Sequence, residues 1–207
     1  MLELLVAMTI GVVLMGIAML SITTFLQTGY NGVASGQAND KAEIALTIIR
    51  RQVVNADVIY NPATEGSNAG PTVPAGFSLR MLTAGARTTA PRATSLATAT
   101  VPTCVQWRLL ATGTLEDRSW PTGHTTPESV RSWRTVATGI TNPTVRAPFT
   151  LDPTGAYGHR VLKIQFVLPD TTKSTGTSIS ITTSVTALDA QFFAPTAAQF
   201  CSPVPAP

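Results

Sequence analysis

The feature that most constrains this chain is a charge-free apolar run near its N-terminus. From Leu4 to Leu26 the sequence has no charged residue and no proline, and it is rich in Leu, Val, Ile and Met. As a helix this run would be about 35 Å long, enough for a hydrocarbon core of about 30 Å. Glu3 stands at its edge and is the only charge before Asp40. We therefore expect a single-pass membrane helix, with a buried helix of a soluble core as the alternative.

The run lacks the features of a secretory signal peptide. Such peptides have a basic start, an apolar centre of about 7–15 residues and a small-residue cleavage site. Here the basic start is missing, the run is longer, and no small-x-small site closes it. Residues 1–27 are therefore predicted to be a transmembrane segment.

Residues 28–57 are predicted to continue as an amphipathic helix. Apolar residues recur there at steps of three and four, which places them on one stripe of a helix. Gly29, Gly32 and Gly36 lower the helix propensity between the two halves, and the helix is expected to stop near Asp57, before turn-forming sequence. The predicted stripe consists of Ala38, Ala42, Ala45, Ile49 and Val53.

Residues 58–207 change to the period of β-strands. Ser178–Ala187 and Val161–Leu168 alternate between apolar and polar residues, as half-buried strands do. An antiparallel sheet tolerates one solvated face, and the apolar helix stripe is the expected cover of the other face. The predicted class is α+β, with a long helix over 1–57 packed on an antiparallel β-sheet domain. Other strands are expected at Phe77–Leu82, Val105–Leu109 and Val130–Ala137, and surface loops at Thr83–Pro102 and Ser119–Pro127.

The N-terminal string LELLVAMTIGVVLMGIAML resembles the start of type IV pilins and type II secretion pseudopilins, the substrates that carry a class III signal. Their pattern is a glycine, a short apolar lead-in and a glutamate that opens a long uncharged apolar stretch. A long helix and a C-terminal β-sheet domain follow in that family. Downstream, KAEIALTIIRRQVVNAD, CVQWRL, SWRTVATGI and SITTSVTAL are similar to the PilW- and GspJ-like minor pilins of the same family.

The resemblance implies a structural subunit of a filament, with a minor subunit that primes assembly or sits at the tip as the favoured role. It implies other pilin subunits as partners through the N-terminal helix, the inner membrane before assembly, and a prepilin peptidase and assembly platform. The expected location is the membrane first and a cell-surface filament afterwards. The glycine and basic leader of the family pattern are absent here, so we expect an internal start or a trimmed end. Alternatives are a major pilin, a pilus-displayed adhesin or DNA-binding module, and a membrane-anchored ectodomain that never polymerises.

Glu3 has two possible roles. By the resemblance, it attracts the free amino terminus of a neighbouring subunit. A carboxylate removed from water costs several kcal/mol unless it is paired, and one ion pair would fix the axial offset of two helices. The alternative is that Glu3 lies in the headgroup region, where the helix dipole favours an anion. The glycines of the run either allow close helix packing or are ordinary glycines of a membrane helix. The residues assigned to filament-core packing are Leu4, Leu5, Val6, Ala7, Gly11 and Gly16.

Cys104 and Cys201 are the only cysteines of the chain. In an oxidising compartment they can form a bridge that attaches the proline-rich tail to a strand. The chain-entropy model assigns such a bridge roughly 4–5 kcal/mol. Free buried cysteines are the alternative, and two cysteines make no zinc motif.

We expect no enzymatic activity, no cofactor and no metal. The sequence has no G-x-S-x-G, H-E-x-x-H, P-loop or G-x-G-x-x-G string, each of which supports a known chemistry. Neither His124 nor His159 has a second histidine at ligand spacing.

A net charge of +3 makes DNA a partner to consider, because clustered arginines attract phosphates. The arginines are scattered along the chain, so a solvated surface is the favoured interpretation and DNA a weak one. Trp107, Trp120 and Trp133 are expected to pack on the sheet. The arginines in question are Arg80, Arg87, Arg92, Arg108, Arg118, Arg131, Arg134, Arg146 and Arg160.

Overall fold

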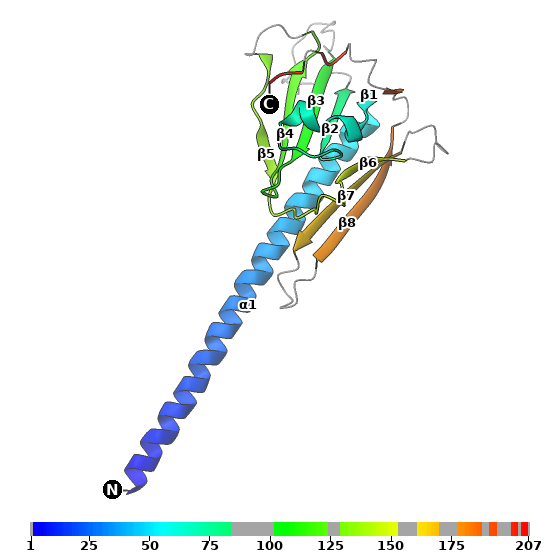
Figure 1. Ribbon diagram of the computed structural model, residues 1–207. Helices are drawn as coiled ribbons and strands as arrows, with labels where there is room; N and C mark the ends of the chain where they lie inside the picture. The colour runs from blue at the N-terminus through cyan, green and yellow to red at the C-terminus, as the bar shows by residue number, and fades with distance from the viewer. Residues whose placement is uncertain are drawn as a thin grey trace, which may run out of the picture.

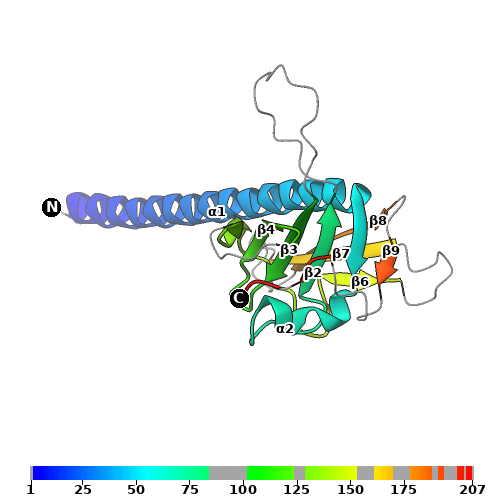
Figure 2. The ribbon, with the colours of Figure 1, turned by 90° about the horizontal axis from the view of Figure 1, so that it is seen from above.

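The computed structural model describes residues 2–83, 102–123, 129–152, 161–169, 178–187, 191–193, 200–202 and 204–206 of the chain. The fold is α+β, with one long N-terminal helix, a six-stranded sheet (sheet A) and a three-stranded sheet (sheet B). Figure 1 shows the helix projecting from the domain that holds both sheets. In Figure 2 both sheets lie on the same side of the helix.

Helix α1 runs from Leu2 to Val54 without interruption, a length of 53 residues, or about 80 Å. The glycines in its middle lie within the helix and do not divide it. It ends before the predicted stop at Asp57. Asn55 closes it, because its main-chain and side-chain amides donate to the Arg51 carbonyl at 3.3 and 2.7 Å. The chain then enters a strand directly, so the predicted boundary between 57 and 58 falls inside that strand.

The apolar stripe predicted for the second half of α1 is confirmed. Ala42, Ala45, Ile49 and Val53 are 0% exposed, and Ala38 packs partly buried against the same core. Their core neighbours come from both sheets. This half of α1 therefore covers the inner faces of the sheets.

Sheet A has the strand order β5-β4-β3-β2-β1-β9. Its strands pair antiparallel except for β9, which pairs with β1 in parallel, a difference from the wholly antiparallel sheet that was predicted. β9 comes from the far end of the chain, so the long connection that a parallel partner requires is present. The strands are β1 (Ala56–Tyr60), β2 (Ser78–Thr83), β3 (Thr103–Leu109), β4 (Leu115–Pro121), β5 (Arg134–Ala137) and β9 (Gln191–Phe193).

Sheet B has the strand order β6-β7-β8 and is antiparallel throughout. The alternation predicted for its two long strands is confirmed. Leu162, Ile164 and Phe166 of β7 are fully buried, and Val185 of β8 is 3% exposed. The strands are β6 (Phe149–Leu151), β7 (Val161–Pro169) and β8 (Ser178–Thr186).

Strand β4 was missed, and its last residues occupy the start of the predicted loop at Ser119–Pro127. Its sequence LEDRSWP has three adjacent charges, which hide the alternation. The acidic side chains are neutralised across the sheet, since Glu116 pairs with Arg108 and Asp117 with Arg134, both at 2.8 Å.

Other boundaries also differ from the prediction. β5 is shorter than the strand predicted at Val130–Ala137, since its first residues are not in the ladder. The segment after β1, predicted as a loop, forms the 3-10 turn η1 (Pro62–Thr64) and the short helix α2 (Gly66–Ala69). Most of the predicted loop Thr83–Pro102 lies outside the described residues.

Apolar side chains gather on both faces of sheet A. The main core lies between α1 and the two sheets and includes Trp107. A second cluster lies on the outer face, where one cross-strand row supplies four members in register. The C-terminal tail reaches this second cluster through Cys201 and Val204. The members of the row are Val58, Leu82, Cys104 and Trp120.

Candidate functional site

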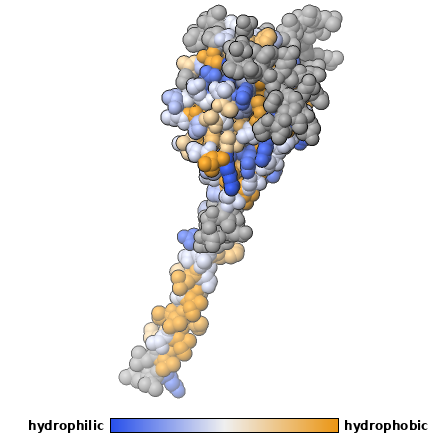
Figure 3. All heavy atoms as spheres, turned by 45° about the vertical axis from the view of Figure 1, so that its right-hand side comes forward, coloured by the Kyte–Doolittle hydropathy of each residue, from blue (hydrophilic) through white to orange (hydrophobic). Residues whose placement is uncertain are grey.

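The first half of α1 lies bare outside the domain. Within it, Val6–Gln27 is long and apolar enough to cross a membrane by length and composition, and none of it is buried. Val12, Met15 and Leu20 are 73%, 70% and 70% exposed, and Figure 3 shows the apolar surface of the projecting helix. A continuous apolar surface of this kind is unfavourable in water. Lipid or another protein chain therefore has to cover it.

The hydroxyl groups of the apolar run are bonded inside the helix. A side-chain hydroxyl that donates to a carbonyl one turn back is satisfied without water, which is the condition for a polar group in lipid. The bonds run from Thr9 to Val6 O at 2.8 Å, from Ser21 to Ile17 O at 2.9 Å, and from Thr23 to Leu20 O at 3.0 Å, with Thr24 also donating to Leu20 O.

Glu3 lies in the first turn of α1 and is exposed. An anion at this end of a helix interacts favourably with the helix dipole. The next residues of the motif, Val6 and Ala7, are exposed as well. Leu4 and Leu5 belong to the helix, while their side chains lie outside the described ones. Glu3 therefore stands at the tip of the bare half, directly before the apolar run that begins at Leu4.

Gly11 and Gly16 lie on the bare half and face open space. A Cβ added at either glycine would meet nothing within 4 Å. They are five positions apart, so on a helix they face directions about 140° apart. The two glycines cannot form a single small-residue stripe, and each would meet a different neighbour.

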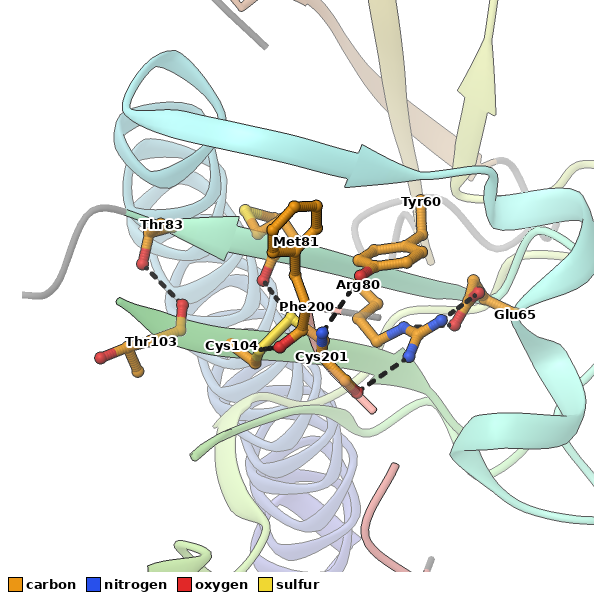
Figure 4. Close-up of a disulfide and its surroundings, with 9 residues drawn as sticks. All are labelled: Tyr60, Glu65, Arg80, Met81, Thr83, Thr103, Cys104, Phe200 and Cys201. Atoms are coloured by element: carbon orange, nitrogen blue, oxygen red, sulfur yellow. Dashed lines mark hydrogen bonds and ion pairs between the residues drawn. A yellow bond between two sulfur atoms is a disulfide. The ribbon is translucent and has the colours of Figure 1, made fainter. Parts of the chain in front are cut away.

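Cys104 of β3 and Cys201 of the tail form a disulfide with an S–S distance of 2.01 Å. Both residues are almost fully buried, at 0% and 1% exposure. Figure 4 shows the bond joining Cys104 to Cys201. Of the two alternatives that the sequence left open, the structure has the bridge.

A buried polar clamp surrounds Cys201. The Arg80 guanidinium lies over the Tyr60 ring, 3.8 Å from its centroid, and pairs with the Glu65 carboxylate at 2.8 Å. Arg80 Nη1 donates to the Cys201 carbonyl, and the Cys201 amide donates to the Tyr60 hydroxyl, both at 3.2 Å. As Figure 4 shows, the tail is held by its disulfide and by both of its main-chain groups at this residue.

Arg118 of β4 holds the tail further along. Its guanidinium donates to the Ala206 carbonyl at 2.7 Å and to the Pro205 carbonyl at 2.9 Å. Burial, together with the nearby Arg108 cation, lowers the pKa of Arg118 to about 10. The group is still a cation at neutral pH, so these are charge-assisted hydrogen bonds.

The structure corrects the interpretation of the arginines as a solvated surface for Arg80 and Arg118. Arg80 and Arg118 are each 4% exposed. Aromatic rings and carbonyl groups take the place of water, and Trp133 has Arg108 and Arg118 against its ring at 3.8 and 4.3 Å. These buried arginines were not predicted from the sequence. The strand alternation could have indicated them, because it places Arg80 of β2 and Arg118 of β4 on the same face of the sheet. Arg131, Arg134 and Arg146 are exposed as expected, and Arg87, Arg92 and Arg160 lie outside the described residues.

The tryptophan prediction is confirmed for Trp107 and Trp120, which are buried on opposite faces of sheet A. In the described part of the chain, no group of three or more His, Cys, Asp or Glu residues could hold a metal ion. His124 and His159 lie outside that part. Comparison with family models, curated proteins and solved structures finds no match to this chain.

Proposed function

We propose that this chain is a structural subunit of a type IV pilus or a type II secretion pseudopilus. The observation that carries the proposal is one 53-residue helix whose second half is built into the domain and whose first half is apolar and bare. Hydrophobic surface of this extent is unfavourable in water. A bilayer can cover it before assembly, and the same half-helices of other subunits can cover it afterwards.

In the proposed filament, Glu3 sets the register between neighbouring helices. The carboxylate stands at the tip of the bare half, so it would leave water when that half is covered. Its removal from water costs several kcal/mol unless a cation is brought to it. The amino terminus of a neighbouring subunit supplies such a cation at one axial offset only, which selects one packing of the helices.

A minor subunit that primes assembly or sits at the filament tip is the favoured role. Its support is the similarity of the downstream strings to PilW- and GspJ-like chains. The test is to shear filaments from the source cells and quantify this chain by mass spectrometry against the most abundant pilin. A trace amount is expected, whereas a dominant amount would make the chain the major pilin.

The second candidate is a membrane-anchored ectodomain that never polymerises, because it would use the same bare half-helix. A DNA-binding module displayed on a pilus has less support. It requires a concentrated basic surface. Two of the arginines, Arg80 and Arg118, are instead buried and hydrogen-bonded inside the domain.

The deciding experiment is to replace Glu3 by glutamine and by alanine. Both variants should insert into the membrane normally and enter filaments at about one tenth of the normal level or less, as expected for loss of a desolvated ion pair. Asp40→Asn is the matched control, since Asp40 is an exposed acidic residue of the same helix outside the apolar half. Normal incorporation of both Glu3 variants would contradict the register role. Recovery of the unmodified chain from membranes alone would leave the anchored ectodomain.

A further inference from the structure

Sheet B ends in a long edge strand. β8 is the last strand in the order β6-β7-β8, and it lies at the flank of the domain in Figure 1. β8 has nine residues, whereas the other edge strands, β5, β6 and β9, have four, three and three. Short edge strands are one way in which proteins prevent pairing with other chains. The length of β8 does not give that protection, and among the described strands only β7 pairs with it.

The hydrogen bonds of β7 show which groups of β8 point to the free edge. In an antiparallel ladder, alternate residues direct both main-chain groups to the same side. The odd-numbered residues of β7 direct theirs away from β8, so its even-numbered residues bond to β8. The bonds that establish this run from Asp152 N to Val161 O at 2.9 Å, from Gln165 N to Pro148 O at 2.9 Å, and from Thr141 N to Val167 O at 2.7 Å.

The register between the two strands then assigns the groups of β8. Even-numbered residues of β7 stand opposite odd-numbered residues of β8, for example Phe166 opposite Ile181 and Ile164 opposite Thr183. These odd-numbered residues of β8 exchange hydrogen bonds with β7. The even-numbered ones, Ser180, Thr182 and Ser184, therefore direct their N–H and C=O groups to the free edge.

The usual obstacles to strand pairing are absent from β8. Its sequence SISITTSVT has no charge, no proline and no glycine, and its nine pairs with β7 run without a register shift. Charges, prolines and bulges are the devices that normally protect an edge. Its residues Ser180, Thr182 and Ser184 are exposed, and Ile179 on the other face is 37% exposed. Small polar groups thus form one face of the edge, and an incompletely covered apolar row forms the other.

We propose that the free edge of β8 binds an extended segment of another protein chain by strand addition. The segment would be apolar at alternate positions, so that its apolar residues continue the row of Ile179 and Ile181 and cover it. Polar residues between them would face solvent beside the Ser and Thr side chains. β7 has this pattern and already pairs with the opposite side of β8. Among the described strands only β7 pairs with β8, and the proposed pairing does not depend on whether the helix enters a filament.

The probe is a fluorescein-labelled peptide VLKIQFVL, which copies Val161–Leu168 and has the alternation of apolar and polar residues that the proposal requires. Binding to the full chain in detergent micelles is measured by fluorescence anisotropy. We expect saturable binding that Thr182→Pro weakens by about tenfold or more, because it removes an outward N–H and adds a ring at the edge. Thr182→Ala is the matched control and should bind as the unmodified chain does. A proline is tolerated where its N–H side faces solvent, and circular dichroism verifies the fold of both variants.

Hydrogen exchange of the unmodified chain gives a readout that does not depend on any variant. With peptide bound, the amides of Ser180, Thr182 and Ser184 should exchange at least about tenfold more slowly. The amides of Ile181 and Thr183 already bond to β7 and should change less. No saturable binding, equal binding by a folded Thr182→Pro chain, or protection that leaves Thr182 unchanged would each overturn the proposal.

Discussion

The two faces of sheet A are covered in different ways. On the inner face, the second half of α1 contributes an apolar stripe and is joined directly to β1 in the sequence. On the outer face, the cover includes a tail from the far end of the chain, attached by the Cys104–Cys201 bridge and by arginines of β2 and β4. Burial of local apolar residues holds the inner cover, whereas a covalent bond and buried polar contacts hold the outer one. The outer cover should therefore be removable while the inner core persists.

The largest effect is expected from Trp107→Ala on the inner face. Trp107 is 0% exposed, and its Nε1 donates to Gln52 Oε1 of α1 at 2.7 Å. Truncation leaves a cavity and removes that bond, so unfolding free energy should fall by about 3–5 kcal/mol. Urea unfolding of the full chain in detergent micelles, followed by circular dichroism, measures it, with Trp107→Phe as the smaller control. A loss below about 1 kcal/mol would mean that the inner core does not dominate stability.

Removal of the bridge by Cys104→Ser with Cys201→Ser tests whether the two faces separate. The loss of unfolding free energy should be about 2–4 kcal/mol, the typical contribution of a disulfide and somewhat less than the chain-entropy model assigns to a loop of this length. Hydrogen exchange should rise in residues 200–206 and in β3, because the tail loses its attachment. The amides around Ile49 on α1 should keep their protection. Loss of protection at Ile49 as well would show that the two covers form one cooperative unit.

A smaller effect is expected from Arg118→Met. The substitution keeps an apolar chain beside the aromatic residues and removes the donors to Pro205 and Ala206. Loss of these charge-assisted bonds should cost about 1–3 kcal/mol and should loosen the end of the tail, since Cys201 stays attached. Carboxypeptidase should then trim the tail faster than in the control Arg131→Met, because Arg131 is exposed. Equal trimming rates would show that the bridge and the other contacts at Cys201 are sufficient to fix the tail.

The smallest effect is expected from Arg134→Ala at the edge of sheet A. Hydrogen bonding to the Asp117 carboxylate raises the pKa of Arg134, so the guanidinium is a cation at neutral pH. The Arg134 side chain is 66% exposed, and such a pair contributes at most about 1 kcal/mol. The difference in urea midpoint from the unmodified chain should shrink further at high salt. A salt-independent loss of several kcal/mol would place this pair among the contacts of the core.

Local periodicity was sufficient for part of this fold. The stripe around Ala45 and Ile49 and the alternation of β7 and β8 could be predicted, because each pattern depends on neighbours within one element. β1 could not, since it follows α1 after one residue and gives no separate turn signal. β4 could not either, because Glu116 and Asp117 become compatible with a sheet only through Arg108 and Arg134 on neighbouring strands.

The two parts of the candidate site differ in the same way. The bare half of α1 is visible in the sequence, since absence of charge over such a length is a local property. The clamp on Cys201 is not visible, because Arg80 and Cys201 are 121 positions apart. An arginine in a strand is normally interpreted as a surface residue. Only the folded chain shows that carbonyl groups and a carboxylate replace its water.

The uninterrupted course of α1 has a mechanical consequence. Between Gln27, where the candidate span ends, and Ala38, where packing on the domain begins, the helix continues for about 15 Å. Because the helix is continuous, rotation of its N-terminal half about the helix axis rotates the domain by the same angle. The direction of Glu3 about the helix axis therefore fixes the direction of the β8 edge about the same axis. In an assembly where the N-terminal helix ends pack in a single arrangement, every subunit would therefore present its β8 edge in the same orientation relative to its neighbours.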